Sequence, residues 1–495
     1  MRLRVPALIV TVPGRTVTAA RREIRRARAA GASFAEVRFD RWSSAERARA
    51  SRLFPTALPL IATLRSRAEG GEGPNARRLR RRWLERTGAL PFDYIDLEYA
   101  RDLEPDGRPP MTVHHRALVS AHFRPRTPIG RVRAVLDDRR LRSVLVKAVV
   151  PASVGRCLRT IVPVVEGRRR GGPFIVHTTG ASGPLLRAWG PQLGLAGVYA
   201  SLPPAGGPAV ELAQLPADRL RRFWSTGGRA RQFAVVGRPI GHSLSPALHQ
   251  RWIDAAHRPG LYVALEIGES SDLRIACERL PAWGYGGLNV THPLKRPALR
   301  LADAVTPAAA ACRGANTLSF RGGRIRADNT DLGAIRRRLD ELVHTGSWDG
   351  RSIAVLGAGG AARATLEAVR SSRTTALVVA RNRARAGAVA RAHGAEVAEN
   401  AAGVRPLVVN ATTVGRRDGG PLGARMAEWV DRAAYLLDWV YRPDDPLLAH
   451  RAHRRRIPYE DGRRLLAYGA AASFGAWWGT SPSTLAIESA IREVM

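Results

Sequence analysis

Short β-branched runs alternate with amphipathic helical patterns along the N-terminal part of the chain, to about residue 225. Strand-like runs occupy residues 8–12, 35–39, 58–64, 94–98, 117–120, 143–149, 173–178 and 197–201. Helical patterns occupy residues 17–30, 44–53, 75–87, 129–139, 153–165, 183–189 and 210–224. Eight strands alternating with helices over this length predict a (β/α)₈ barrel. Between the fourth and fifth strands, residues 101–115 are too rich in proline and glycine for a normal helix.

A second α/β pattern fills the rest of the 495-residue chain, whose length suits about three domains. The segment 225–228, Ser-Thr-Gly-Gly, is typical of a linker, and a new strand begins at 233–236. Another strand, 352–356, runs into a glycine-rich turn and a helix. The expected α/β architecture is a TIM barrel at 1–226, a substrate domain at 232–335 completed by 470–495, and a Rossmann domain at 336–469.

The composition is that of a globular protein, with 45% apolar and 24% charged residues. The three cysteines, Cys157, Cys277 and Cys312, are too widely spaced for a metal motif or a disulfide framework, which suits a reducing compartment. The first apolar run is too short for a signal peptide, and 465–479 is too short to span a bilayer. We therefore expect a cytoplasmic protein with no membrane contact and no metal site, and a buried helix at 465–479.

The formal net charge of +37 is the one extreme value in the composition. A clustered basic face would indicate nucleic-acid binding. Here the arginines are spread over the whole length and lie on helical stretches such as 21–28 and 77–86, without a basic tail or interleaved aromatic residues. We expect solvated surface arginines whose field attracts small anionic substrates, rather than a nucleic-acid partner.

Of the 79 basic residues, only Lys147 and Lys295 are lysines, and the other 77 are arginines. Arginine keeps its proton in proteins, whereas a lysine amine can lose its proton and act as a nucleophile or proton carrier. The alternative is that two lysines survived a composition bias by chance. Their positions favour catalysis, because Lys147 ends an apolar strand-like run and Lys295 closes the motif at 287–295.

Polar side chains follow the ends of the predicted barrel strands, and a barrel gathers its active site at that end. They are Glu36, Arg38, Arg65, Glu69, Asp96, Glu98, His122 and Lys147. One amine and one imidazole converging there predict imine chemistry. Lys147 would condense with a ketone, and His122 would remove the adjacent acidic proton and then protonate a leaving hydroxyl.

In this order along eight strands, the residues resemble type I 3-dehydroquinate dehydratase over about residues 5 to 225. The resemblance rests on Glu36-x-Arg38, Arg65-Ser66 with Glu69-Gly70-Gly71, Tyr94–Glu98, Ser120-Ala121-His122, Lys147 and Arg187. It implies Lys147 as the Schiff-base lysine, His122 as acid and base, and Glu69 as the group that orients His122. The implied substrate contacts are Glu36, Arg38, Arg65, Ser201 and Arg187, the last binding a carboxylate.

The chain departs from that family after the eighth strand. Where a Ser-x-Pro-Gly-Gln-like loop is expected, residues 201–207 read Ser-Leu-Pro-Pro-Ala-Gly-Gly, so neither Ala205 nor Gly207 supplies the glutamine amide. One hydrogen bond to a neutral hydroxyl is worth about 0.5–1.5 kcal/mol, or up to about tenfold in affinity. Its loss weakens substrate binding without removing the chemistry.

A denser set of motifs occupies the C-terminal part. Its members are Ser243 and Ser245 after a strand, Asn289-Val290-Thr291 before Lys295, Gly314-Ala315-Asn316-Thr317, and Asp328-Asn329-Thr330-Asp331. A lysine and an aspartate that share a proton beside an alcohol can accept and return the hydroxyl proton during hydride transfer. Together the motifs resemble shikimate dehydrogenase over about residues 232 to 495.

By this resemblance Lys295 and Asp331 form the catalytic pair. The implied shikimate contacts are Ser243, Ser245, Thr291, Asn316 and Asp331, with Tyr441 also lining the site. Three positions depart from the family: Gly469 replaces a glutamine, Arg464 replaces a small residue, and Arg313 replaces a glycine. The departures concern substrate binding and leave the lysine–aspartate chemistry in place.

The strand at 352–356 is followed by Gly357, Gly359, Gly360 and Ala361, which lets the backbone approach a pyrophosphate at a helix N-terminus. The next strand ends in Ala-Arg-Asn-Arg-Ala-Arg at 380–385, where an NAD enzyme keeps an acid for the ribose. Arginine suits a 2′-phosphate, so we predict NADP. The expected contacts are Arg381 first, then Arg385 or Arg383, and Asn410 beneath the nicotinamide arm. The alternative is that these are three more of the 77 arginines.

These inferences predict a bifunctional enzyme that dehydrates 3-dehydroquinate to 3-dehydroshikimate and reduces that product to shikimate with NADPH. The first alternative is a quinate/shikimate dehydrogenase with an impaired barrel, because Gly469 leaves room for a differently substituted ring. The second is a non-catalytic sensor of the same pathway. A sensor would be expected to lose the lysines, His122 or Asp331, and all are present.

Overall fold

The computed structural model describes residues 6–168, 172–202, 214–227, 230–398, 400–401, 405–416, 419–441 and 446–493. By compactness the chain divides into two units, one holding residues 1–231, 239–241 and 263–284, the other holding the remainder. The described residues form three sheets, one of eight strands and two of six. The three-domain boundaries expected from the sequence remain a prediction.

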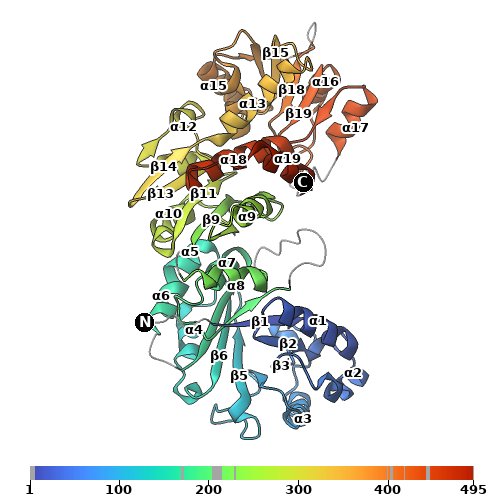
Figure 1. The fold of residues 1–495 in the computed structure, drawn as a ribbon, viewed down its shortest axis with the longest axis vertical. Coiled ribbons are helices and arrows are strands. Elements are labelled where there is room, and N and C mark those ends of the chain that lie inside the picture. Colours follow the sequence, from blue (N-terminus) through green and yellow to red (C-terminus); the bar gives the residue numbers. More distant parts are fainter. Residues whose placement is uncertain are drawn as a thin grey trace. The chain divides into compact units, whose positions relative to one another are not determined.

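The eight-stranded sheet is the predicted barrel (Figure 1). Its strands are β1 (Ala7–Val12), β2 (Phe34–Arg38), β3 (Leu60–Thr63), β4 (Tyr94–Glu98), β5 (Ala117–His122), β6 (Leu145–Pro151), β7 (Phe174–Thr179) and β8 (Gly197–Ala200). They pair in parallel in the order β7-β6-β5-β4-β3-β2-β1-β8, so each strand lies beside its neighbour in sequence and β1 returns to β8. The strand pattern in the sequence therefore gives the (β/α)₈ fold that was predicted.

Helices follow most of the strands. They are α1 (Val17–Ala29), α2 (Ser44–Ala48), α3 (Arg77–Gly88), α4 (Ile129–Leu136), α5 (Val154–Arg156), α6 (Val162–Gly167), α7 (Gly183–Ala188) and α8 (Ala217–Ser225). The single helix predicted at 153–165 is interrupted by a π-helical turn at Cys157–Ile161. Pro163 in α6 has no N–H for the carbonyl four residues earlier, which accounts for the break in the α-helical ladder.

The proline-rich segment after β4 forms no α-helix, as predicted, and contains one 3₁₀ turn at His114–Arg116. A buried ion pair ties it to the barrel. Arg80 on α3 donates to both carboxylate oxygens of Asp102, at 2.6 and 2.5 Å, and to the carbonyl of Leu64 at 2.8 Å. This pairing satisfies a guanidinium that is 1% exposed, so an irregular segment keeps a fixed path.

Side chains inside the barrel lie in layers supplied by alternate strands. Odd-numbered strands supply one apolar layer, made of Ile9, Ile61, Leu118 and Ile175. The next layer toward the carboxyl ends comes from even-numbered strands and is polar. Its members are Glu36 on β2, Asp96 on β4, Lys147 on β6 and Tyr199 on β8. The charged groups inside the barrel therefore pack directly against a layer of apolar side chains.

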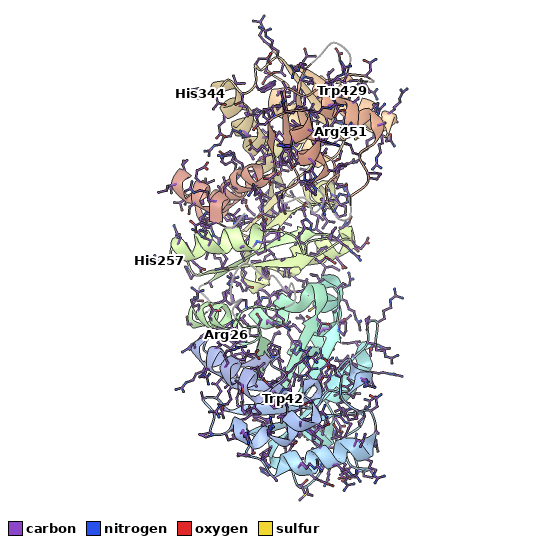
Figure 2. All side chains as sticks on the ribbon, turned by 90° about the vertical axis from the view of Figure 1, so that its right-hand side faces the viewer. Arg26, Trp42, His257, His344, Trp429 and Arg451 are labelled. Atoms are coloured by element: carbon purple, nitrogen blue, oxygen red, sulfur yellow. The ribbon has the colours of Figure 1, made fainter. Side chains whose placement is uncertain are left out.

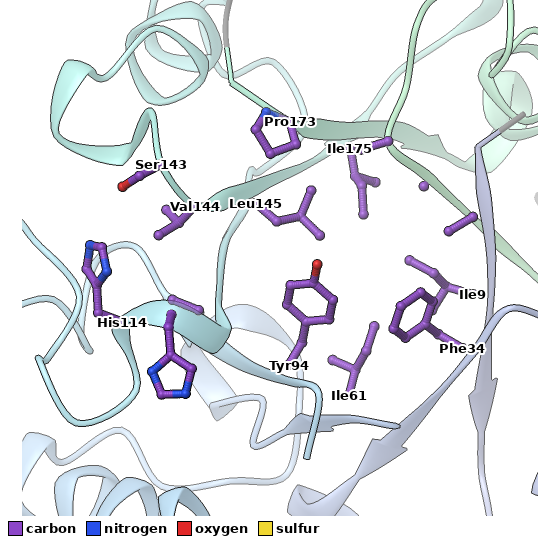
Figure 3. Close-up of a pocket in the computed structure, with 15 residues that line it drawn as sticks. Ile9, Phe34, Ile61, Tyr94, His114, Ser143, Val144, Leu145, Pro173 and Ile175 are labelled. Atoms are coloured by element: carbon purple, nitrogen blue, oxygen red, sulfur yellow. The ribbon is translucent and has the colours of Figure 1, made fainter. Parts of the chain in front are cut away.

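The opposite end of the barrel is not completely filled. The even-numbered strands there contribute Phe34, Tyr94, Leu145 and Gly197, and the glycine supplies no side chain. A cavity of about 180 Å³ remains, with Ile9, Ile61 and Ile175 among its walls (Figure 3). The polar layer with the predicted catalytic residues thus lies at the carboxyl ends of the strands, and the cavity lies at their amino ends.

The second sheet has the order β10-β9-β11-β13-β14-β12. Its strands are β9 (Arg231–Gly237), β10 (Gly260–Glu266), β11 (Tyr285–Val290), β12 (Ala304–Val305), β13 (Thr317–Arg321) and β14 (Arg324–Asp328). The helices of this segment are α9 (Ser245–Ala255), α10 (Ser270–Arg279), α11 (Lys295–Arg300), α12 (Pro307–Ala311) and α13 (Thr330–His344). β9 and β11 are parallel, whereas β13 is antiparallel to β11 and β14.

The third sheet is parallel, in the order β17-β16-β15-β18-β19-β20. Its strands are β15 (Ser352–Leu356), β16 (Thr375–Val379), β17 (Glu396–Val397), β18 (Leu407–Asn410), β19 (Tyr435–Asp438) and β20 (Tyr459–Glu460). The remaining helices are α14 (Gly360–Val369), α15 (Arg383–His393), α16 (Ala424–Asp431), α17 (Leu447–Arg454), α18 (Arg463–Trp478) and α19 (Thr484–Glu493). β15 lies between β16 and β18, so the strand order reverses there, which is where open α/β sheets bind ligands.

Tryptophans such as Trp42 and Trp429 are buried, while Arg26 lies on the outward side of α1 (Figure 2). The helix predicted at 465–479 is α18, and most of its residues are buried.

No helix among the described residues has the length and apolar character needed to cross a membrane. In that same part of the chain, no group of histidine, cysteine and acidic side chains could hold a metal ion.

Candidate active sites

Lys147 lies inside the barrel in the polar layer. Its Nζ donates to Glu36 Oε1 and Asp96 Oδ2, each at 3.2 Å, and to the Tyr199 hydroxyl at 3.0 Å. Three acceptors satisfy the three N–H bonds of an ammonium group. Only 4% of the side chain is exposed, so the amine lies in the barrel interior and away from bulk solvent.

The charge of the amine follows from its neighbours. Burial lowers the pKa of Lys147, but the carboxylates of Asp96 and Glu36 outweigh burial and raise the pKa well above its ordinary value. Burial also raises the pKa of Glu36, yet Lys147 and Arg38 bring it down to about 2. The resting amine is therefore protonated, and it must pass a proton on before it can attack a ketone.

Glu36 is fixed by three hydroxyl groups from three strands. Thr11 donates to Oε2 at 2.7 Å, while Thr63 and Tyr199 donate to Oε1 at 3.0 and 2.9 Å. Sequence reasoning identified Glu36 but missed Thr63 and Tyr199. The sequence did contain a signal for Tyr199. Residues two apart on a strand lie on the same face, and Tyr199 is two residues before the predicted site residue Ser201.

His122, at the end of β5, is paired with Glu69 from the 3₁₀ turn Arg67–Glu69, with Nδ1 2.6 Å from Oε2. Burial raises the pKa of Glu69 to about 8, and Glu98 and Asp96 add to the rise. Burial and the charge of Lys147 lower the pKa of His122 well below its ordinary value. Both effects disfavour the ion pair, so the imidazole is neutral, and Nε2 is the nitrogen left for a substrate.

Two arginines predicted to bind substrate lie beside the polar layer. Arg38 donates from Nε and Nη2 to the two oxygens of Asp40, each at 2.8 Å. Arg65 donates from Nε to the carbonyl of Glu69 at 2.7 Å, which holds the turn that carries the carboxylate. Burial, and then the charge of Arg38, lower the pKa of Arg65. Two neighbouring cations suit an anionic substrate.

Arg187 on α7 reaches the carboxyl ends of the last two strands. Its Nε donates to the carbonyl of Tyr199 at 2.9 Å, and Nη1 donates to those of Thr178 and Gly183 at 3.0 and 2.8 Å. These bonds give Arg187 a role in holding β7 and β8, which the sequence did not indicate. Carboxylate binding by Arg187 stays a prediction. Ser201 follows β8, and the loop residues 203–213, where the glutamine is missing, lie outside the described residues.

Three buried polar atoms near Lys147 have no hydrogen-bond partner in the described part of the chain. They are Asp96 Oδ1, Ser120 Oγ and His177 Nδ1. His177 is a second imidazole of the barrel interior that sequence reasoning missed, and its ring lies 5.2 Å from that of Tyr199. Burial and the charge of Arg187 lower its pKa well below the ordinary value. Unsatisfied buried groups beside a nucleophile are suited to a polar substrate.

The second lysine forms a different constellation. Lys295 Nζ, at the first residue of α11, is 2.5 Å from Asp331 Oδ2 at the start of α13. Asn316 Nδ2 donates to Asp331 Oδ1 at 2.8 Å. Asn316 Oδ1 in turn accepts the backbone N–H of Thr330 at 2.8 Å. The carboxylate of Asp331 therefore has a fixed orientation beside the amine of Lys295.

The predicted shikimate contacts group around two serines. Ser243 and Ser245 are each 6% exposed, and Ser243 Oγ accepts the backbone N–H of Ser245 at 3.3 Å. Burial raises the pKa of the Tyr441 hydroxyl, which also hydrogen-bonds to Ser243. Thr291 follows β11, and its methyl group occupies the space where a side chain on Gly237 would lie. The structure thus brings Ser243 and Tyr441 together, and their contact with shikimate stays a prediction.

The glycine turn after β15 fits a dinucleotide phosphate. Gly357 has φ +110°, and an added Cβ would lie 2.9 Å from the carbonyl of Ala411, so a side chain is excluded there. An added Cβ at Gly359 would meet open space, which leaves the N-terminus of α14 accessible. One turn into α14, Arg363 Nη1 is buried without a partner among the described residues. Backbone N–H groups and a free guanidinium nitrogen form an anion site.

Arginines also stand where β16 ends. Arg385 donates from Nε to the carbonyl of Ala358 in the glycine turn at 3.1 Å, which draws the start of α15 to that turn. Arg381 is exposed, and its Nη1 would lie 3.2 Å from a Cβ on Gly420. Burial, and then the charges of Arg296, Arg313 and Arg385, lower the pKa of Arg363. A positive field without an acid at the end of β16 suits a 2′-phosphate.

Comparison with known proteins agrees with these two constellations. The shikimate dehydrogenase (NADP(+)) of Dinoroseobacter shibae is 36% identical over 257 residues, covering 50% of this chain and 92% of that protein. The chain belongs to the shikimate dehydrogenase family. Residues 235–318 match the shikimate dehydrogenase substrate binding domain, and residues 8–229 match type I 3-dehydroquinase. A type I 3-dehydroquinase barrel is thus joined to a shikimate dehydrogenase.

Two further relatives illustrate the likeness of the dehydrogenase half. The shikimate dehydrogenase (NADP(+)) of Paracoccus denitrificans is 37% identical over 260 residues, covering 50% of this chain and 90% of that protein. A crystal structure of shikimate 5-dehydrogenase from Thermus thermophilus in complex with NADP(H) and shikimate is 32% identical. It covers 54% of this chain and 100% of that chain, with a TM-score of 0.47.

One predicted cofactor contact of the dehydrogenase half has its side chain bonded within the protein. Asn410 is 1% exposed. Its Nδ2 donates to Asp438 Oδ1 at 2.8 Å, and its Oδ1 accepts the backbone N–H of Thr412 at 3.1 Å. The side chain thus holds the loop after β18, and a contact between Asn410 and the cofactor stays a prediction.

The dehydrogenase half also contains a site residue that sequence reasoning missed. The Tyr262 hydroxyl donates to Asn289 Oδ1 at 2.7 Å and also contacts the Ser245 side chain. Its ring stacks on His249 with centroids 4.3 Å apart. Nothing in its local sequence marks Tyr262, because it lies in an apolar strand. Its role depends on β10 and β11 sharing one sheet.

Proposed function

We propose that the chain catalyses two consecutive reactions of the shikimate pathway. The barrel dehydrates 3-dehydroquinate to 3-dehydroshikimate, and the dehydrogenase half reduces this product to shikimate with NADPH. One observation carries the proposal: the only two lysines of the chain each lie in a separate constellation of titratable groups. Small anionic molecules are the expected substrates, attracted by the net charge of +37. We expect the protein to act in the cytoplasm, without a nucleic-acid partner.

In the barrel, Lys147 loses a proton and attacks the substrate ketone. The C–N bond forms, the carbonyl oxygen leaves as water, and an iminium results. The iminium makes the adjacent C–H bond acidic, and His122 Nε2 removes that proton. The electron pair of the C–H bond then forms the new double bond as the hydroxyl leaves, protonated by His122. Water finally hydrolyses the imine and restores the amine of Lys147.

In the dehydrogenase half, bound NADPH supplies the hydride. Lys295 Nζ lies 2.5 Å from Asp331 Oδ2, and the lysine would give a proton to the developing alkoxide of the product. Asn316 fixes the carboxylate of Asp331, and Ser243 with Tyr441 provides hydroxyl groups for the substrate. The glycine turn and Arg363 would hold the pyrophosphate, while Arg381 and Arg385 would hold the 2′-phosphate.

A quinate/shikimate dehydrogenase is a second candidate, favoured by Gly469. A Cβ added at Gly469 would lie 3.6 Å from Thr330 Oγ1, next to the network of Asn316 and Asp331. The family resemblance implies a glutamine at this position, so the side chain expected to contact the substrate ring is absent from this chain. Steady-state rates with quinate and with shikimate distinguish the two: a higher kcat/KM for quinate would favour the second candidate.

The proposal is tested by a coupled assay containing 3-dehydroquinate, NADPH and the protein. Lys147→Arg should abolish NADPH oxidation from 3-dehydroquinate and leave oxidation from added 3-dehydroshikimate intact. Lys295→Arg should abolish both signals while dehydration, followed by the absorbance of the enone, continues. Each variant keeps the charge and serves as the folding control of the other. Loss of both activities in both variants would contradict two independent sites.

A further inference from the structure

Tyr199 is the fourth member of the polar layer and the one without a formal charge. Its hydroxyl accepts from Lys147 Nζ at 3.0 Å and donates to Glu36 Oε1 at 2.9 Å. Lys147 and Glu36 also contact each other directly at 3.2 Å. The three groups therefore form a closed triangle of hydrogen bonds in a buried space.

We propose that Tyr199 is a positioning residue for imine formation, which fixes the direction of the lone pair that Lys147 uses to attack. This inference rests on the proposed dehydratase function. An amine that has lost one proton keeps two N–H bonds. If Tyr199 and Glu36 hold those two, the amine cannot rotate, and the lone pair appears where the third N–H bond pointed, toward Asp96.

Asp96 is the group suited to take that proton. Glu36 already accepts hydrogen bonds from Thr11, Thr63, Tyr199 and Lys147. Asp96 Oδ2 accepts from Lys147 at 3.2 Å and from Thr63 at 3.3 Å, while Asp96 Oδ1 is buried without a partner in the described part of the chain. The step balances: the N–H bond to Asp96 breaks and the carboxylate gains the proton. The carboxyl then turns this O–H to the substrate carbonyl oxygen, which frees the nitrogen lone pair to form the C–N bond. The carbonyl oxygen takes up the displaced electron pair.

The ring of Tyr199 has little freedom to move its hydroxyl away. It is 7% exposed and packs on the apolar layer formed by Ile9, Ile61, Leu118 and Ile175. On another side the imidazole of His177 lies 5.2 Å from it at an interplanar angle of 51°. Such packing holds an aromatic side chain in one rotamer, so the hydroxyl position is set by the barrel wall.

The test compares Tyr199→Phe with Tyr94→Phe. Both remove one hydroxyl from a barrel tyrosine, but Tyr94 lies in the layer at the other end, away from Lys147. The readout is the rate at which borohydride traps the 3-dehydroquinate adduct. Loss of a hydrogen bond to a charged group predicts a fall of roughly 10- to 100-fold for Tyr199→Phe. Tyr94→Phe should trap at the rate of the unaltered protein.

Several readouts separate positioning from a general structural effect. A positioning role lowers kcat for dehydration and leaves KM, the melting temperature and reduction of 3-dehydroshikimate unchanged. Equal trapping rates in Tyr199→Phe and the unaltered protein would overturn this inference alone. Absence of any adduct in the unaltered protein would overturn the dehydratase function and this inference with it.

Discussion

Lys295 packs its aliphatic chain against Gly360, where an added Cβ would lie 3.1 Å from Lys295 Cδ. The proton-carrying lysine and the first residue of α14 are therefore in direct contact. The contact joins the acid–base pair to the turn that is suited to hold the cofactor. A substitution at Gly360 should therefore affect proton transfer by displacing Lys295.

Variants of the neighbouring residues Gly359 and Gly360 should distinguish effects on cofactor binding from effects on proton transfer. Gly360→Ala should displace Lys295 by a few tenths of an ångström and lower kcat of reduction by roughly tenfold, because proton transfer depends on short donor–acceptor distances. Gly359→Ala meets no protein atom within 4 Å but adds a methyl group at the phosphate site. It should instead raise the Kd of NADPH. Steady-state kinetics and fluorescence titration measure the two effects, and identical profiles would contradict the assignment.

The pH dependence of dehydration should follow the pair of His122 and Glu69. Burial raises the pKa of Glu69 to about 8, so below that pH the carboxyl keeps its proton and donates it to His122 Nδ1. The imidazole then carries its own proton on Nε2 and cannot act as a base. The dehydration rate should therefore rise as the pH increases through about 8.

Glu69→Gln tests this relationship. The glutamine oxygen can still accept from Nδ1–H of His122, but no carboxyl titrates. The rise near pH 8 should disappear, and the rate at high pH should fall by roughly tenfold because the imidazolium loses its counter-charge. A rate profile measured from pH 6 to 9.5 decides the point. An unchanged rise in the variant would show that another group controls it.

Asp438 should make the C-terminal unit less stable as the pH rises. Burial raises the pKa of this carboxyl from 3.8 to about 7, although Val440, Asn410 and Tyr459 hydrogen-bond to it. The folded state therefore favours the protonated form. This stabilisation is complete below pH 3.8 and is lost as the pH rises through about 7, amounting to about 4 kcal/mol in all.

The variant Asp438→Asn mimics the protonated carboxyl. Its oxygen can still accept from Asn410 and from the backbone of Val440. Denaturant unfolding of the variant should show a smaller decrease in stability between pH 5 and 8 than the unaltered protein shows. Parallel pH curves for the two proteins would exclude Asp438 as the cause.

The choice of NADP over NAD should depend on Arg381. Arg381→Ala removes a charged contact to the 2′-phosphate and should raise the Kd of NADPH by roughly 10- to 100-fold, while the Kd of NADH stays the same. Arg383→Ala, two residues further on, is the matched control and should change the Kd of NADPH less. A similar loss for NADH and NADPH would mean that Arg381 supports the fold and does not read the phosphate.

The eight barrel strands could be predicted because each is a short apolar run bounded by polar residues, a pattern that local residues decide. The strand predicted at 94–98 is β4, and the one at 352–356 is β15, without any change in bounds. The π-helical turn at Cys157–Ile161 was not foreseen, since it depends on how Pro163 breaks a ladder that otherwise continues.

The site residues also divide into those that the sequence indicated and those that only the fold reveals. Lys147 and Lys295 could be singled out because lysine is rare in this arginine-rich chain, whereas the roles of Glu69 and Asp331 were implied by the family resemblances. Tyr199, His177 and Tyr262 were missed, because each lies in an apolar strand and gains its polar partner only from another strand. For Tyr199, the alternation of β8 indicated a side chain inside the barrel but not its partners. Asn410 shows the converse: the residue type indicates a site, but the three-dimensional packing turns the side chain inward.

In the proposed mechanism Lys147 forms the covalent bond to substrate and Lys295 transfers a proton. Borohydride reduction in the presence of 3-dehydroquinate, followed by peptide mass spectrometry, separates the two roles, because the chain offers only these two lysine ε-amines. We expect a reduced adduct on Lys147 and none on Lys295. An adduct on Lys295, or no adduct on Lys147 with a folded protein, would contradict this mechanism.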